Sequence, residues 1–122
     1  MDIEQLRSYC LSKHGATEDL PSDEVTLTIR VMKKIFALLP LDTPDRVNLK
    51  CDPEKAATLR EHYHAVKPGF HMNKKHWNTV FLFQDAPPDL IKGWVDHSYH
   101  LVVQSLTKKQ QEELTNLQQS IP

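Results

Sequence analysis

Glycine and cysteine are scarce in this sequence of 122 residues, which holds only three glycines and two cysteines. The glycines, at positions 15, 69 and 93, are too far apart to form the glycine-rich loop that cradles nucleotide phosphates. This excludes nucleotide hydrolysis by a P-loop. Cys10 and Cys51 lack the spacing of zinc motifs, and we expect both to be reduced, buried thiols.

Long apolar runs and an export signal are missing as well. The longest apolar stretch, residues 35–39, is far too short to cross a membrane. Residues 1–4 contain neither the basic region nor the apolar region of a signal peptide. We therefore expect a cytoplasmic protein with no membrane partner.

The sequence also contains no motif that assembles a reaction. Asp96, His97 and Ser98 are the residue types of a hydrolytic triad. On a helix, however, side chains one and two positions apart diverge by roughly 100–200° and do not converge on one substrate. We assign no catalytic residue from the sequence.

Histidine is more frequent, but its spacing does not build a metal site. His97 and His100 lie three positions apart and form half of a site, whereas a closed zinc site needs four ligands. The other pairs also lack further ligands: His62 with His64, and His71 with His76. We expect no stoichiometric metal and no other cofactor.

Charge is unevenly distributed along a chain whose net charge is only −1. Residues 46–76 hold seven Lys and Arg against three Asp and Glu, a balance of +4, and the rest of the chain balances at −5. This asymmetry permits one positive face that attracts an anionic partner. An ordinary solvated face has the same appearance in sequence.

The hydrophobic periodicity of the first half predicts a helix and an antiparallel meander. Asp2 and Gln5 form a capping box for a helix that ends at Gly15. A polar turn is expected at 17–23. Alternation predicts strands at 25–31, 35–39 and 47–51, with a turn at Lys33-Lys34 between the first two.

In the second half, Asp52-Pro53 is a strong start for a helix that stops before Pro68-Gly69. A strand at 77–83 is apolar on both faces and should lie inside the sheet. A long helix at 89–106 and a polar helix or tail at 107–122 complete the chain. Thr107 and Gln110 form the capping box of that last element.

These elements predict one domain over residues 1–122 of the α+β class, in the order α-β-β-β-α-β-β-α-α. It should have two layers, with an antiparallel sheet of about five strands and the helices on one face. The expected core contains Leu6, Leu27, Ile29, Val47, Leu59, Val80, Trp94 and Leu101.

Residues 69–80 place histidine, lysine and asparagine beside a tryptophan, between two apolar runs. Cationic groups pair with phosphate and rings stack on bases. Strand alternation puts Arg46, Asn48 and Lys50 on one face. If the turn lies beside that strand, the two segments form one anion-binding or nucleic-acid-binding surface: Arg46, Asn48, Lys50, His71, Asn73, Lys74, Lys75, His76 and Trp77.

A structural interpretation of the same residues remains open. Asparagine side chains often satisfy backbone groups in turns, which would account for Asn48, Asn73 and Asn78. Trp77 would then serve to pin its hairpin to the sheet.

Several segments resemble the MmcQ/YjbR family of small bacterial proteins, nearly from end to end. The matching segments are Leu6-x-x-Tyr9-Cys10-Leu11 with Gly15, 36–39, 46–53, 68–80 and 96–99. The resemblance implies a frataxin-like (CyaY-like) α+β fold and a suggested role in DNA binding through a "double-wing" motif. Frataxins present a dense acidic ridge on their first helix, which this chain lacks, so iron binding does not follow from the fold.

Three functions remain open at this point. The first is a non-enzymatic DNA-binding protein whose affinity is weak and sensitive to salt. Lys50, Lys74, Lys75 and Arg46 would contact phosphates, Asn48, Asn73 and His76 would read polar groups, and Trp77 would stack. The second is a module that binds an acidic protein or a small anionic ligand. The third is an enzyme that uses His71 or His76 as an acid or base.

Overall fold

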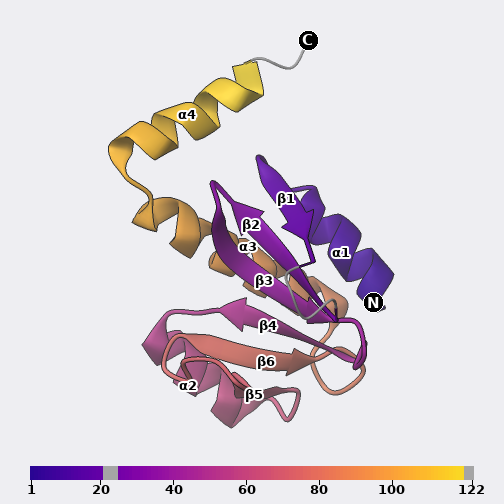
Figure 1. Cartoon of the computed structure of the whole chain (residues 1–122). Helices are drawn as coiled ribbons and strands as arrows, with labels where there is room; N and C mark the ends of the chain where they lie inside the picture. The colour runs from indigo at the N-terminus through magenta and orange to yellow at the C-terminus, as the bar shows by residue number, and fades with distance from the viewer. Residues whose placement is uncertain (21–24, 120–122) are drawn as a thin grey trace.

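The computed structural model describes residues 1–20 and 25–119. Over these residues the chain forms four helices and six strands (Figure 1). In chain order they are α1 (Ile3–Leu11), β1 (Ala16–Asp19), β2 (Thr26–Val31), β3 (Lys34–Pro40), β4 (Arg46–Lys50), α2 (Pro53–His62), β5 (Val66–Pro68), β6 (Trp77–Phe81), α3 (Pro88–Ser105) and α4 (Lys108–Gln119).

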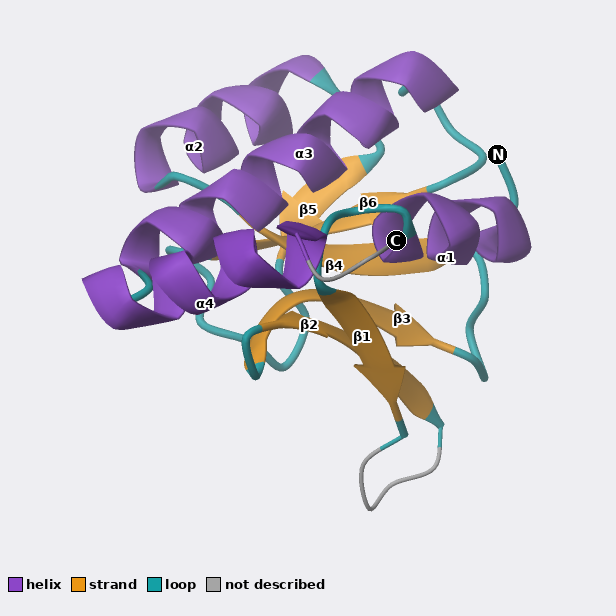
Figure 2. Cartoon of the chain, turned by 90° about the horizontal axis from the view of Figure 1, so that it is seen from above, coloured by secondary structure: helices purple, strands orange, loops and turns teal. Residues whose placement is uncertain are grey.

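All the strands belong to one antiparallel sheet with the order β1-β2-β3-β4-β6-β5. This confirms the α+β class and the antiparallel meander. Strand β6 lies between β4 and β5, as its two apolar faces predicted, although it ends at Phe81 rather than at residue 83. Helices α1, α2 and α3 lie on the same side of the sheet (Figure 2).

The sixth strand, β1, is an element that the sequence did not predict. We expected a polar turn from residue 17, but Ala16–Asp19 pairs with β2 and forms one edge of the sheet. Its polar side chains are held by ion pairs that only the fold creates. Arg7 Nε lies 2.7 Å from Glu18 Oε2, and Arg30 Nε lies 3.2 Å from Asp19 Oδ1. Residues 21–23 of the expected turn lie outside the described residues.

The predicted helix caps are present. The Asp2 carboxylate accepts from Gln5 N at 2.9 Å, and the Gln5 side chain accepts from Asp2 N at 3.0 Å. Asp52 caps α2, and Thr107 forms a capping box with Gln110 before α4. Helix α1 ends at Leu11, however, and not at Gly15. Gly15 has a φ of +74° in the turn into β1.

The hairpin between β2 and β3 turns one residue earlier than expected. Met32 and Lys33 both have positive φ, which matches the right-handed twist of a two-residue hairpin turn. The pairing register then shifts beside Arg30, because Phe36 is an extra residue in β3. Phe36 is fully buried and meets the ring of Tyr99 edge-on, with ring centroids 5.4 Å apart.

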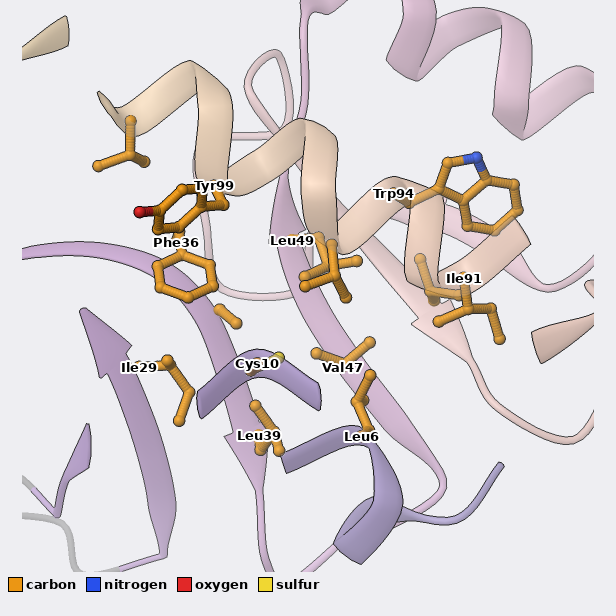
Figure 3. Packing of buried hydrophobic residues seen from close by; sticks show 14 of the residues in the cluster. Leu6, Cys10, Ile29, Phe36, Leu39, Val47, Leu49, Ile91, Trp94 and Tyr99 are labelled. Carbon is orange, nitrogen blue, oxygen red and sulfur yellow. The ribbon is translucent and has the colours of Figure 1, made fainter. Parts of the chain in front are cut away.

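The core lies between the sheet and helices α1 and α3 (Figure 3). Six of the eight expected core residues are buried, and two are only partly buried, Leu59 and Leu101. The prediction for Leu101 was wrong because the buried stripe of α3 runs along a neighbouring face. That stripe consists of Ile91, Trp94, Val95, Ser98, Tyr99 and Val102. Leu90, at the start of the same helix, is 38% exposed.

Helix α4 extends beyond the strands in Figure 1, and its Gln111 Nε2 donates to the Val103 carbonyl near the end of α3 at 3.2 Å. Leu114 is its buried residue, and His14 Nε2 lies 2.6 Å from the Leu114 carbonyl oxygen. The side of the sheet opposite α1, α2 and α3 carries no helix in Figure 2. We call this side the open face.

Candidate functional site on the open face

A row of five side chains crosses the open face, because the strands are paired in register. Thr28, Leu38, Asn48, Thr79 and Lys67 lie directly opposite one another on β2, β3, β4, β6 and β5. Side chains alternate between the two faces of a strand. The neighbours of Asn48 on β4, which are buried against the helices, fix this row on the opposite side.

A groove of about 670 Å³ lies at the β2–β3–β4 end of this row. The turn at 70–72, between β5 and β6, forms its far wall. Its apolar lining includes Ile35, Leu38, Pro40, Phe70 and Met72, and its hydroxyl groups come from Thr26, Thr28 and Thr43. Charged or titratable side chains also reach it: Arg30, Asp42, Arg46 and His71. A groove with this lining suits a ligand that is partly apolar and partly polar.

Asn48 is held in one orientation by a short chain of hydrogen bonds. The backbone N–H of Phe70 donates to Thr79 Oγ1 at 3.0 Å. The Thr79 hydroxyl donates to Asn48 Oδ1 at 2.5 Å. Among the described residues, nothing accepts a hydrogen bond from the Asn48 amide nitrogen. This chain also ties the turn at 70–72 to the floor of the sheet.

Arg46 is fixed beside two aromatic rings. Its Nε donates to Asp45 Oδ1 at 2.8 Å, and this contact holds the pKa of Asp45 below its ordinary value. The guanidinium carbon lies 4.8 Å from the ring centroid of Phe81. Phe81 in turn meets Phe70 edge-on, with centroids 6.2 Å apart. Phe70 remains 40% exposed. A cation and an accessible ring therefore stand side by side at the edge of the groove.

Four lysines surround this region without an ion pair in the described part of the chain. Lys50 on β4 lies opposite Trp77, and Lys67 on β5 lies opposite Thr79. Lys74 and Lys75 are exposed in the turn between β5 and β6. Their charges are thus available to an anionic partner.

The turn that carries Lys74 and Lys75 is anchored to α2. Arg60 Nε donates to Asn78 Oδ1 at 2.7 Å, and the same guanidinium donates to the Lys74 carbonyl. Asn73 Oδ1 accepts from the backbone N–H of Lys75 at 3.0 Å. Asn73 thus stabilises the turn, which is the structural role that the sequence left open beside a role in ligand binding. The His76 carbonyl accepts from Cys51 N at 2.8 Å and joins the turn to the end of β4.

Trp77 is partly buried and lies outside the groove. Gly69 N donates to the Trp77 carbonyl at 2.9 Å. A Cβ atom on Gly69 would lie only 2.8 Å from Trp77 Cβ and 3.0 Å from its carbonyl oxygen. The hairpin closes here because residue 69 has no side chain.

The nine site residues predicted from the sequence therefore separate into two groups. Arg46, Asn48 and His71 line the groove. The other six lie on β4, in the turn or at the start of β6, outside the groove lining: Lys50, Asn73, Lys74, Lys75, His76 and Trp77.

Sequence reasoning missed several residues of this face, notably Thr28, Arg30, Lys67, Phe70 and Thr79. The alternation of Thr26, Thr28 and Arg30 with buried residues was a visible signal for the polar side of β2. The two apolar faces of β6 predicted a central strand but not its neighbours, and its place beside β4 brings Thr79 to Asn48.

The three adjacent residues of α3 that resemble a triad are held apart. Asp96 Oδ1 accepts from the Tyr9 hydroxyl at 2.6 Å, whereas His97 Nε2 accepts from Asp52 N at 3.2 Å. Ser98 donates to the Phe36 carbonyl at 2.6 Å. Each side chain thus serves a different structural contact.

Within residues 1–20 and 25–119, no three His, Cys, Asp or Glu side chains are grouped as metal ligands. No helix there has the length and apolar character needed to span a bilayer.

A second hollow, of about 570 Å³, lies beside α1 and the start of α3. Tyr9, Ser12 and Lys92 are among its lining residues. The Tyr9 hydroxyl is already bonded to Asp96, and the Lys92 ammonium lies 5.5 Å from the Tyr9 ring centroid. Its polar groups are engaged with one another, so we regard the open face as the stronger candidate.

Comparisons with known proteins agree with the resemblance seen in the sequence. The YjbR family model matches residues 11–101. The uncharacterized protein YjbR of Escherichia coli K12 is 35% identical over 118 residues, which cover 96% of this chain and 100% of that protein. The uncharacterized protein YyaQ of Bacillus subtilis 168 is 27% identical, over 80% of this chain and 95% of that protein.

Solved structures show the same fold. The crystal structure of Deinococcus radiodurans protein DR2400 superposes with a TM-score of 0.86 at 35% identity, over 93% of this chain and 87% of that one. A crystal structure from Pseudomonas syringae gives a TM-score of 0.72 at 26% identity, over 83% and 98% of the two chains. The sequence matches and these structures together establish that the chain belongs to the YjbR family of bacterial proteins.

Proposed function

We propose that this protein is a non-enzymatic binding protein that holds single-stranded DNA on the open face. The main support is the combination of lysines without ion pairs in the described residues, on and beside a face that no helix covers, with the accessible ring of Phe70. Lysine meets phosphate as a point charge, and exposed rings stack on bases of any sequence. Lys50, Lys67, Lys74 and Lys75 supply the charges, and Phe70 supplies the accessible ring.

A duplex fits the open face poorly. The major groove of B-DNA is about 12 Å wide and admits an α-helix or a two-stranded ribbon. Neighbouring strands lie about 4.8 Å apart, so six strands span roughly 24 Å. A single strand has no such limit, because its bases are free to lie flat against a sheet.

Affinity should come mainly from the release of counterions by phosphates, and it should fall steeply with salt. The net charge of −1 gives the molecule little long-range attraction for DNA. Binding is therefore expected to be weak, and to depend on the local charge of this face.

The test is an anisotropy titration with a labelled oligonucleotide of about 12 nucleotides, as a single strand and as its duplex. We expect saturable binding of the single strand at low salt and weaker binding of the duplex. If the single strand does not bind even at low salt, the proposal is wrong. Tighter binding of the duplex would contradict the choice of strand.

A small anionic ligand is the second candidate, and the groove is the observation that favours it. Its volume is typical of small-molecule sites, and Arg46 and His71 reach it. Arg46 is paired with Asp45 and Arg30 with Asp19, however, so little net charge is left for an anion inside the groove. This places DNA first, with the unpaired lysines outside the groove as its contacts.

We propose no reaction for His71 or His76. Neither ring makes a hydrogen bond within the described residues, so no partner positions it as an acid or base.

A further inference from the structure

We infer that the groove holds one unpaired base of the bound strand and prefers thymine to cytosine. This rests on the proposed function, because the strand must first lie on the open face. Within that function it names the determinant of base preference, which is the fixed amide of Asn48.

The orientation of the Asn48 amide follows from its neighbours. Phe70 N–H donates to the Thr79 hydroxyl, and that hydroxyl donates to Asn48 Oδ1. Thr79 is fully buried on β6, on one side of Asn48. The trigonal amide then directs its nitrogen to the other side, toward β3 and Leu38 on the groove floor. The amide oxygen faces Thr79, so the amide nitrogen with its two N–H donors is the group that Asn48 presents to the groove.

The rest of the groove suits a planar base. Phe70 on the wall provides an apolar contact for one face of the base, and Leu38 lies on the apolar floor. The volume of about 670 Å³ is large enough for one nucleotide. Thr28 is 1% exposed, and its hydroxyl has no partner within the described residues, so it adds a polar group at the bottom.

The direction in which a base enters decides what Asn48 meets. The lysines hold the sugar–phosphate chain outside the groove, so the edge of the base farthest from the sugar reaches the floor. In a pyrimidine this is position 4, opposite the glycosidic nitrogen. Thymine carries a carbonyl acceptor there and cytosine carries an amino donor. The amide nitrogen of Asn48 can donate a hydrogen bond to the thymine carbonyl. In cytosine it faces an amino group, which is a second donor.

The test compares labelled dT, dU and dC oligonucleotides of one length with the parent protein. We expect dT and dU to bind about threefold to tenfold more tightly than dC, because one hydrogen bond is gained and one donor clash is avoided. Equal affinities for dT and dC would overturn the inference and leave the proposed function intact. Binding of dU at the level of dC would also overturn it, because the methyl group would then explain the preference.

Two variants separate the amide from the rest of the site. Thr79→Val removes the hydroxyl that fixes the amide, so the dT to dC ratio should approach one while the salt dependence stays. Asn48→Asp replaces the donors by acceptors, so the ratio should move toward cytosine although both affinities fall. Circular dichroism and melting temperature check that each variant is folded. An unchanged ratio in a folded variant overturns the inference, and absence of all DNA binding by the parent overturns the proposed function itself.

Discussion

Tyr9 and Asp96 join α1 to α3 by one hydrogen bond, and the charge state of both side chains depends on it. The bond to Asp96 is the main cause that raises the pKa of Tyr9 to about 12. Burial alone would raise the pKa of Asp96, but hydrogen bonds from Lys13 and Tyr9 outweigh it and hold the pKa below its ordinary value. This contact therefore favours the folded state when Asp96 is ionised.

The sign of the pH dependence follows from that lowered pKa. The stabilising contribution of the Asp96 contact is present above the pKa that Asp96 has in the unfolded chain. It is lost as pH falls through the lower pKa that Asp96 has in the folded protein. Asp96→Asn should therefore lower the melting temperature at neutral pH. The melting temperature of the variant should also fall less than that of the parent between about pH 5 and pH 2. Thermal melts across this range measure both effects. A variant that melts in parallel with the parent at every pH would contradict this explanation.

The two cysteines lie within the core and should be chemically inert in the folded protein. Burial raises the pKa of the Cys10 thiol to about 12 and that of Cys51 to about 11. Since the thiolate is the reactive form, a thiol reagent near neutral pH should react slowly with the native protein. Both thiols should react rapidly in guanidinium chloride. Fast modification of either thiol under native conditions would show that it is more accessible than the structure indicates.

At the scale of elements, helix starts were well predicted because they depend on neighbouring residues. Asp52 accepts from Lys55 N at 3.2 Å at the start of α2. Asp52→Ala should lower the free energy of unfolding by about 1 kcal/mol, measured by urea denaturation. Asp52→Asn keeps a side-chain oxygen and should recover most of the loss. Equal losses in the two variants would mean that charge, rather than capping, is responsible.

The β5–β6 hairpin depends on a glycine for a reason that only its closed structure reveals. A methyl group at Gly69 would meet the Cβ and the backbone of Trp77. Gly69→Ala should cost about 1–3 kcal/mol of stability because the hairpin must open to admit it. Urea denaturation followed by tryptophan fluorescence measures the change.

Gly93 provides the matched control for that substitution. It lies in α3, and a Cβ atom there has nothing within 4 Å among the described residues. Gly93→Ala should stabilise the protein by roughly 0.5–1 kcal/mol, because alanine favours a helix. If both alanine variants changed stability in the same direction, the close approach of Gly69 to Trp77 would not be the cause.

Elements that depend on distant partners were predicted less well. The edge strand β1 forms by pairing with β2, and Arg7 and Arg30 contact its acidic residues; none of these partners is local in sequence. Leu101 was placed in the core by periodicity, but α3 is rotated so that Ser98 faces the sheet and bonds to Lys50 N and the Phe36 carbonyl.

At the scale of the whole molecule, one set of site residues could be foreseen and another could not. Alternation in β4 places Arg46 and Asn48 on one face from the sequence alone. The groove needs the turn at 70–72 to fold back over the sheet, which depends on the pairing of β6 with both β4 and β5. Lys74 and Lys75, which follow that turn before β6, remain exposed and lie outside the groove.

The proposed binding surface depends most on contacts between DNA phosphates and the two lysines between β5 and β6. Lys74 and Lys75 form no ion pair in the described part of the chain, so their joint replacement by alanine should change stability little. Lys108 and Lys109 form a second exposed pair, at the start of α4. Their replacement removes the same charge from another element.

The most direct measurement is the slope of log affinity against log salt for a single-stranded oligonucleotide. We expect Lys74→Ala with Lys75→Ala to weaken binding at low salt and to flatten the slope by about one to two units. Lys108→Ala with Lys109→Ala should leave the slope unchanged. If both double variants have the slope of the parent, or if both lose it equally, the lysines of the β5–β6 turn do not contact the phosphates and the proposed site is wrong.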